Sequence, residues 1–184
     1  MIIRINTPLT HECVKGLRAG NMVEITGYVY TARDAAHQKL MELIHAGKEL
    51  PFEIKDQIVY YVGPCPAPEG KVIGSAGPTT SGRMDKYAPK LIELGMTGMI
   101  GKGQRSAAVV EAMQKHGAVY FGAIGGAGAL ISKCIKKSEL IAFPELGTEA
   151  VRKLTVEEFP AVVVIDAYGS NLYDIGRKQY ALEL

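Results

Sequence analysis

A nine-residue segment, GPTTSGRMD at residues 77–85, combines the residue types of an anion-binding loop. Two glycines bracket a turn, three hydroxyl side chains cluster between and beside them, and Arg83 follows at the start of a predicted helix. Exposed backbone N–H groups at a loop–helix junction bind anions. An arginine there can hold a carboxylate or a phosphate through two parallel bonds. The segment therefore favours a site for an anionic small molecule over a plain turn.

Two nucleotide-binding patterns are incomplete in this sequence. The segment at 77–85 has the glycine spacing of a phosphate-binding loop, but Arg83 and Met84 stand where that motif needs lysine and a metal-binding hydroxyl. The glycine-rich stretch GGAGAL at 125–130 has Ile131 where a dinucleotide-binding loop needs its third glycine. We expect neither an NTPase nor a dinucleotide-binding protein.

Two more basic residues follow predicted strands. In TARDAAH, residues 31–37, Arg33 lies at the start of a predicted helix, where the helix dipole disfavours a cation unless an anion or a carboxylate faces it. Asp34 suits the beginning of that helix, and His37 is expected to be a packed or solvated residue rather than a catalyst. Lys102 lies between two glycines that would let a ligand approach the backbone closely, although a flexible loop with a solvated lysine fits the pattern equally well.

The three basic residues share a position relative to the predicted strands. In α/β sheets, ligands bind outside the carboxyl ends of the strands. Because Arg33, Arg83 and Lys102 would all lie at such ends, we expect them to meet at one edge of a sheet.

The pattern of apolar residues predicts the elements that place these side chains. From residue 72 onward strands and helices alternate, which favours an α/β domain with parallel strand pairs. The first 70 residues have fewer helices, which suggests a mixed or second sheet. We predict a single α/β domain over residues 1–184, with a mostly parallel sheet and a second, smaller sheet. Strands are expected at 2–6, 22–31, 58–62, 72–74, 98–100, 118–123, 141–143 and 161–166, and helices at 13–17, 32–47, 85–94, 106–116 and 125–136.

Composition excludes several classes of protein. The chain is 47% hydrophobic and 22% charged with a net charge of +2, and its basic residues form no stripe of the kind that binds nucleic acid. No run approaches the roughly 18 apolar residues of a membrane-spanning helix. The N-terminus lacks the pattern of a secretory signal, so a cytoplasmic location is expected.

The three cysteines, Cys13, Cys65 and Cys134, are widely separated. Their odd number argues against a disulfide framework, and no CxxC pair or Cys/His cluster is present. We expect three buried thiols and no metal bound by this chain alone.

Four segments together resemble one family. TARDAAH, GPTTSGRMD, GMIGKG and HGAVYFGAIGGAGAL look like the C-terminal region of class I fumarases. They are equally similar to the β subunits of two-subunit fumarases and L(+)-tartrate dehydratases. The similarity runs from about residue 7 to the DIGRKQY segment at 174–180, and four motifs in one order are more specific than any single one.

The resemblance implies a hydro-lyase that adds water to a C4 dicarboxylate double bond or removes it, with fumarate and L-malate as the leading pair. It also implies a swivelling β/β/α fold. A [4Fe–4S] cluster would be supplied by an α subunit, and the two chains would form a hetero-oligomer such as α₂β₂.

Residue roles follow from the same resemblance, position by position. Arg33 and Arg83 would hold substrate carboxylates, and Thr80 would belong to the same substrate-binding set. Thr79 would be the base at the carbon that loses or gains a proton, with Lys102 beside it. A threonine is a poor base unless a cation and fixed donors stabilise its alkoxide, so its presence at the site is better supported than its role.

Some questions stay open at the level of sequence. Cys65 departs from the small residue expected at its position. L(+)-tartrate is an alternative substrate. A regulatory or assembly subunit, or a stand-alone organic-anion-binding protein, would be a non-catalytic alternative.

Overall fold

Seven strands form one partly closed sheet in the computed structural model, which describes residues 1–181. The strands are hydrogen-bonded in the order β1-β2-β3-β4-β5-β7-β6, and β2 also pairs with β7. Their bounds are β1 (Ile2–Asn6), β2 (Met22–Thr31), β3 (Ile58–Tyr60), β4 (Gly98–Gly101), β5 (Val119–Gly122), β6 (Ile135–Ala142) and β7 (Val151–Ile165).

The direction of the strands divides the sheet into two parts. Strands β1 to β5 pair in parallel, so the carboxyl ends of β2, β3 and β4 lie at the same edge. Strand β7 runs antiparallel to β2, β5 and β6. Since β7 bonds to both β2 and β5, the strands β2, β3, β4, β5 and β7 close into a ring.

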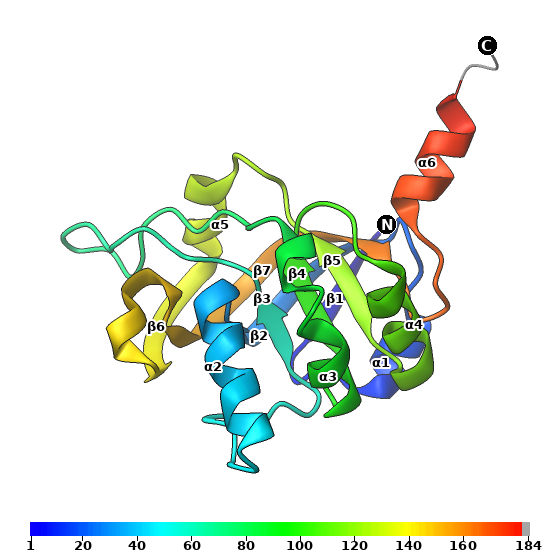
Figure 1. Cartoon of the computed structure of the whole chain (residues 1–184). Coiled ribbons are helices and arrows are strands. Elements are labelled where there is room, and N and C mark those ends of the chain that lie inside the picture. Colours follow the sequence, from blue (N-terminus) through cyan, green and yellow to red (C-terminus); the bar gives the residue numbers. More distant parts are fainter. Residues whose placement is uncertain (182–184) are drawn as a thin grey trace.

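Helices cover the sheet unevenly (Figure 1). Helices α2, α3 and α4 lie side by side in front of the strands, whereas α6 projects away from the body. No helix among residues 1–181 is long and apolar enough to span a membrane. The helices are α1 (His11–Gly16), α2 (Asp34–His45), α3 (Ala88–Glu93), α4 (Ala107–His116), α5 (Gly128–Cys134) and α6 (Leu172–Tyr180), with 3₁₀ turns η1 (Ser81–Met84) and η2 (Pro144–Glu149).

The alternation of side chains along each strand builds two cores. In and after β3, Ile58 and Tyr60 belong to a cluster on the enclosed side of the sheet, together with Phe121 of β5. Val59 and Tyr61 belong to a second cluster, which packs the sheet against α2, α3 and α4. Strand β3 is therefore buried on both faces, and the residues that follow it are held firmly.

The predicted α/β class and the parallel strand pairs are confirmed. The expected second, smaller sheet is instead continuous with the first. The reason is the length of β7, whose 15 residues reach β6 at one end, β5 at the other and β2 between them.

Three local predictions were wrong. Residues 72–74 form no strand, because Gly74 and Ser75 fold back to bond the backbone of Cys65 in an irregular loop. The helix expected at 125–136 ends at Cys134, and Lys136 lies in β6. The cysteines are free but not buried, since Cys65 is exposed and the other two are only partly covered.

Candidate functional site

The loop at residues 77–85 enters the sheet between the carboxyl ends of β3 and β4. The Thr79 N–H donates to the carbonyl oxygen of Tyr61 at 2.7 Å, and the Lys102 N–H donates to the Thr79 carbonyl at 3.3 Å. The Ser81 N–H then donates to the Lys102 carbonyl at 2.8 Å, and Thr80 forms a parallel bridge with Lys102. Thr79 and Lys102 are thus neighbours, fixed by backbone bonds.

Close packing at this junction requires a glycine. A Cβ added to Gly101 would lie 1.9 Å from the Ser81 hydroxyl oxygen, an impossible contact. Gly103, on the other side of Lys102, has φ +83°, a conformation that side chains with a Cβ rarely adopt. The two glycines that flank Lys102 are therefore required by the backbone conformation and close packing of the loop.

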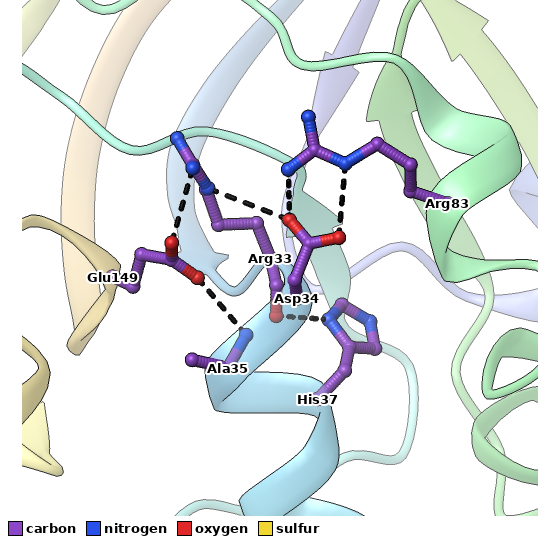
Figure 2. Close-up of polar contacts among 6 residues, drawn as sticks. All are labelled: Arg33, Asp34, Ala35, His37, Arg83 and Glu149. Carbon is purple, nitrogen blue, oxygen red and sulfur yellow. Dashed lines mark hydrogen bonds and ion pairs between the residues drawn. The ribbon is translucent and has the colours of Figure 1, made fainter.

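Arg33 lies at the first turn of α2, and a protein carboxylate faces it (Figure 2). Its Nη2 is 3.0 Å from Oε1 of Glu149, at the end of η2. The other oxygen of Glu149 accepts a hydrogen bond from the Ala35 N–H at 2.9 Å. The Glu149 carboxylate therefore neutralises both the exposed N–H dipoles of the helix start and the arginine placed there.

Asp34 lies between the two candidate arginines (Figure 2). Arg83 donates from Nε to Oδ1 of Asp34 at 2.9 Å and from Nη2 to Oδ2. Arg33 Nε lies 3.6 Å from the same Oδ2. The hydrogen bonds from Arg83 hold the pKa of the Asp34 carboxyl below its usual value, so this carboxylate stays charged.

Gly63, just beyond β3, fixes the direction of the Arg33 side chain. A Cβ added at Gly63 would lie 2.5 Å from Arg33 Nη1 and 3.0 Å from its Cδ. The guanidinium therefore rests against the bare backbone of the loop that follows β3.

Lys102, Thr79 and Thr80 carry the polar side-chain groups of the site that stay available to a ligand. The Lys102 side chain is exposed and passes over Gly125, where an added Cβ would meet its Cδ at 3.5 Å. Within residues 1–181, its ammonium group has no ion-pair partner. Thr79 is half-buried and Thr80 is exposed.

The structure thus brings the five site residues predicted from the sequence to the carboxyl edge of β2, β3 and β4. They are Arg33, Thr79, Thr80, Arg83 and Lys102. The two arginines are joined through Asp34, and Thr79 is joined to Lys102. A cavity of about 290 Å³ beside Pro64–Ala67 is lined by none of the five, which lie at the open edge of the sheet. Chemically, the edge offers guanidinium groups for carboxylates, together with threonine hydroxyls and an ammonium group on neighbouring residues.

His37 is packed, as expected, and is not available to a substrate. Its ring is fully buried between Tyr61 and Tyr87, and Nδ1 lies 3.0 Å from the Arg33 carbonyl oxygen. Burial lowers the pKa of His37 to about 4, with a smaller contribution from the Arg105 charge. A neutral imidazole therefore donates from Nδ1 to the carbonyl oxygen of Arg33, the N-cap residue of α2.

Sequence patterns did not reveal Glu149, Gly63 or the function of Asp34. Glu149 lies 116 positions after Arg33, in a segment with no local signal. Asp34 appeared only as a residue suited to a helix start. The one available indication was the arginine at an unfavourable helix position, which predicted that a carboxylate would face it.

The described residues do not form a ligand set for an iron–sulfur cluster. Within residues 1–181, no three His, Cys, Asp or Glu side chains gather in a way that could hold a metal ion.

Comparisons with known proteins match this chain to one family. The family model described as "Fumarase C-terminus" matches residues 1–176. The anaerobic class I fumarate hydratase of Escherichia coli (strain K12) is 48% identical over 162 residues, which cover 86% of this chain and 30% of that protein. Fumarate hydratase 2 of Leishmania major is 45% identical over 156 residues, 84% of this chain and 28% of that protein.

A shorter relative has nearly the same length as this chain. The Methanocaldococcus jannaschii protein named "Putative L(+)-tartrate dehydratase subunit beta" is 36% identical over 179 residues, which cover 94% of this chain and 92% of that protein. The chain spans less than a third of the fumarate hydratases quoted above and almost all of this subunit. On the match over residues 1–176, this chain belongs to the fumarase C-terminus family.

Proposed function

We propose that this chain is the β subunit of a two-chain hydro-lyase that interconverts fumarate and L-malate. The observation that carries the proposal is the meeting of Arg33, Arg83, Thr79 and Lys102 at one sheet edge. The fumarate hydratases among its relatives support the reaction class, and the match to almost the whole of the M. jannaschii protein supports the β-subunit role.

The two arginines bind the substrate carboxylates. Arg83 uses Nε and Nη2 on Asp34, which leaves its Nη1 side for a ligand. Arg33 uses Nη2 on Glu149, and its Nη1 faces the open loop backbone at Gly63. Two guanidinium groups at one edge suit a substrate with two carboxylates, because each keeps N–H donors beyond those that face Asp34 and Glu149.

Thr79 and Lys102 act at the carbon that exchanges a proton. The backbone bond between them makes the two residues neighbours. A nearby cation would stabilise the oxyanion that a proton-accepting threonine becomes. Thr80, exposed on the next position, contacts the substrate from the same loop.

A partner α subunit completes the site from the open side of the edge. It would supply the [4Fe–4S] cluster that the family resemblance implies, and such a cluster would act as a Lewis acid toward the substrate hydroxyl. The two chains form a hetero-oligomer, α₂β₂ in its simplest symmetric form, and act in the cytoplasm.

L(+)-tartrate is the second candidate substrate. The specific observation in its favour is the match to the M. jannaschii subunit over 92% of that protein. Tartrate carries two carboxylates like malate, so the same arginines would serve both.

The test is anaerobic co-expression with the α subunit, followed by assays with fumarate, L-malate and L(+)-tartrate. We expect hydration or dehydration of at least one of them by the complex and none by either chain alone. A complex that binds these acids without converting any would support the organic-anion-binding alternative instead.

A further inference from the structure

Asp34 forms the most direct link between the two substrate-binding arginines, and the proposed reaction gives it no role. Its carboxylate receives two hydrogen bonds from Arg83, 49 residues away in the chain, and faces Arg33 Nε at 3.6 Å (Figure 2). The carboxylate remains half-exposed, with 38% of the side chain accessible.

We propose that Asp34 is a positioning residue that sets the direction and spacing of the Arg33 and Arg83 guanidinium groups. The inference rests on the proposed function, because it assigns those groups to the two carboxylates of one substrate.

The geometry of the pair supports positioning. Arg83 meets Asp34 through its Nε–Nη2 side, so its Nη1 points away from Asp34 (Figure 2). An arginine side chain has several rotatable bonds, and an exposed one samples many directions. Two bonds to one carboxylate remove most of this freedom before the substrate arrives, which lowers the entropic cost of binding.

The charges of the cluster support it as well. Two arginines face two carboxylates, Asp34 and Glu149, so the cluster is close to neutral without a ligand. Asp34 begins α2, where the helix N-terminus favours a negative charge. Its carboxylate is therefore held by the helix as well as by the arginines, and is not free to swing away.

The opposite role, in which Asp34 competes with the substrate for Arg83, makes the reverse prediction. A competitor lowers affinity, so its removal would lower KM. A positioning residue raises affinity, so its removal raises KM. The variant Asp34→Asn separates the two, because it keeps the size of the side chain and removes the charge and one acceptor.

The matched control is another ion pair made by helix α2. Lys39 of α2 pairs with Glu145 of η2 at 2.9 Å, an exposed ion pair that touches none of the site residues. Glu145→Gln removes one charge from an exposed α2 pair, as Asp34→Asn does. We expect it to leave KM and kcat at the wild-type values.

The experiment is a double-mutant cycle on the αβ complex, with Asp34→Asn, Arg83→Met and the double variant. We expect Asp34→Asn to raise KM roughly tenfold, the scale of one charge-assisted hydrogen bond, with a smaller change in kcat. The effect of Asp34→Asn should largely disappear in the Arg83→Met background, as coupling through Arg83 requires. Glu145→Gln and Arg83→Met should instead combine additively. A lowered or unchanged KM in Asp34→Asn, or a full effect in the absence of Arg83, would overturn the proposal.

A second measurement does not depend on catalysis. In ¹⁵N-labelled chain, the Arg83 Nε–H group should give a signal protected from solvent exchange in the wild type and in Glu145→Gln. We expect that protection to be lost in Asp34→Asn. If the wild-type complex converts no dicarboxylate, the proposed function is wrong. Unchanged protection of the Arg83 Nε–H group in Asp34→Asn would show, independently of that result, that Asp34 does not position Arg83.

Discussion

The hydroxyl groups of Ser81 and Tyr120 lie 2.9 Å apart in the buried layer beneath the Thr79 loop. The Tyr120 hydroxyl also lies 2.9 Å from the Gly103 carbonyl oxygen, to which it donates its single proton. The Ser81 hydroxyl must therefore be the donor to Tyr120. This chain of bonds ties the loop that carries Thr79 to the loop that carries Lys102.

Tyr120→Phe should slow catalysis without unfolding the chain. The change removes both side-chain bonds and keeps the ring, so Thr79 and Lys102 lose part of their mutual alignment. We expect kcat of the αβ complex to fall about tenfold, since misplacement of a catalytic group by a fraction of an ångström has effects on this scale. Tyr28→Phe is the control, because within residues 1–181 the Tyr28 hydroxyl makes no hydrogen bond. Equal activity of the two variants would refute the coupling.

Arg83→Lys tests whether the Arg83 guanidinium group binds a substrate carboxylate through two parallel hydrogen bonds. A lysine ammonium keeps the charge but cannot offer two parallel bonds to a carboxylate. The loss should be about 1.5–3 kcal/mol, or one to two decades in kcat/KM. Full activity on every dicarboxylate tried would show that Arg83 does not hold a carboxylate.

Thr79→Val tests the proposed base. Valine has the shape of threonine without the hydroxyl, so binding should persist while proton transfer fails. General acid–base catalysis typically contributes about 10²–10⁴-fold, and kcat should fall within that range. Thr79→Ser should restore most of the activity. A valine variant within tenfold of the wild type would leave Thr79 with a positioning role only.

Gly63→Ala should displace Arg33. The added methyl group would lie 2.5 Å from Arg33 Nη1, and the flexible end of the side chain is what would move. We expect a fall in kcat/KM on the order of 10- to 100-fold with little change in Tm. Gly16→Ala, where an added Cβ meets nothing within 4 Å, is the control. A loss of Tm with unchanged kinetics in the folded fraction would contradict the prediction.

Acid should destabilise the chain through His37. Its folded pKa of about 4 lies below the ordinary value of 6.5, so the unfolded chain binds the proton more readily. Stability is therefore complete above about pH 6.5 and decreases as the pH falls toward 4, by about 3 kcal/mol for this residue. Urea unfolding between pH 7 and pH 4 should show this slope in the wild type and a flatter one in His37→Gln. Parallel slopes would mean that another group is responsible.

The sequence predicts the elements whose pattern is local. Strand β2 was expected with the bounds that it has, because ten residues rich in β-branched and aromatic side chains indicate a strand on their own. Helix α4 was expected within one residue, and in the structure it ends at Gly117 in the left-handed conformation. Arg33, Arg83 and Lys102 were found because each lies close to a predicted element, whereas the roles of Thr79 and Thr80 came from the resemblance to the family.

Elements held by distant partners could not be predicted in this way. The first ten residues of β7 include two glutamates and Pro160, a poor strand pattern, yet they pair with β2 and β6. Pairing with β2 and β6 stabilises this part of β7 although its local sequence does not favour a strand. The same holds for the Glu149–Arg33 pair, whose two members come from different segments that only the folded chain brings together.

The long strand β7 also has a consequence for how the chain reaches its folded state. Until residues 151–165 are available, β2 and β5 each present an unpaired edge, and an open edge invites pairing with another chain. Synthesis from the N-terminus produces β2 about 120 residues before the strand that covers it. Ring closure must therefore be among the last steps of folding, and the nascent chain is most exposed to aggregation just before it.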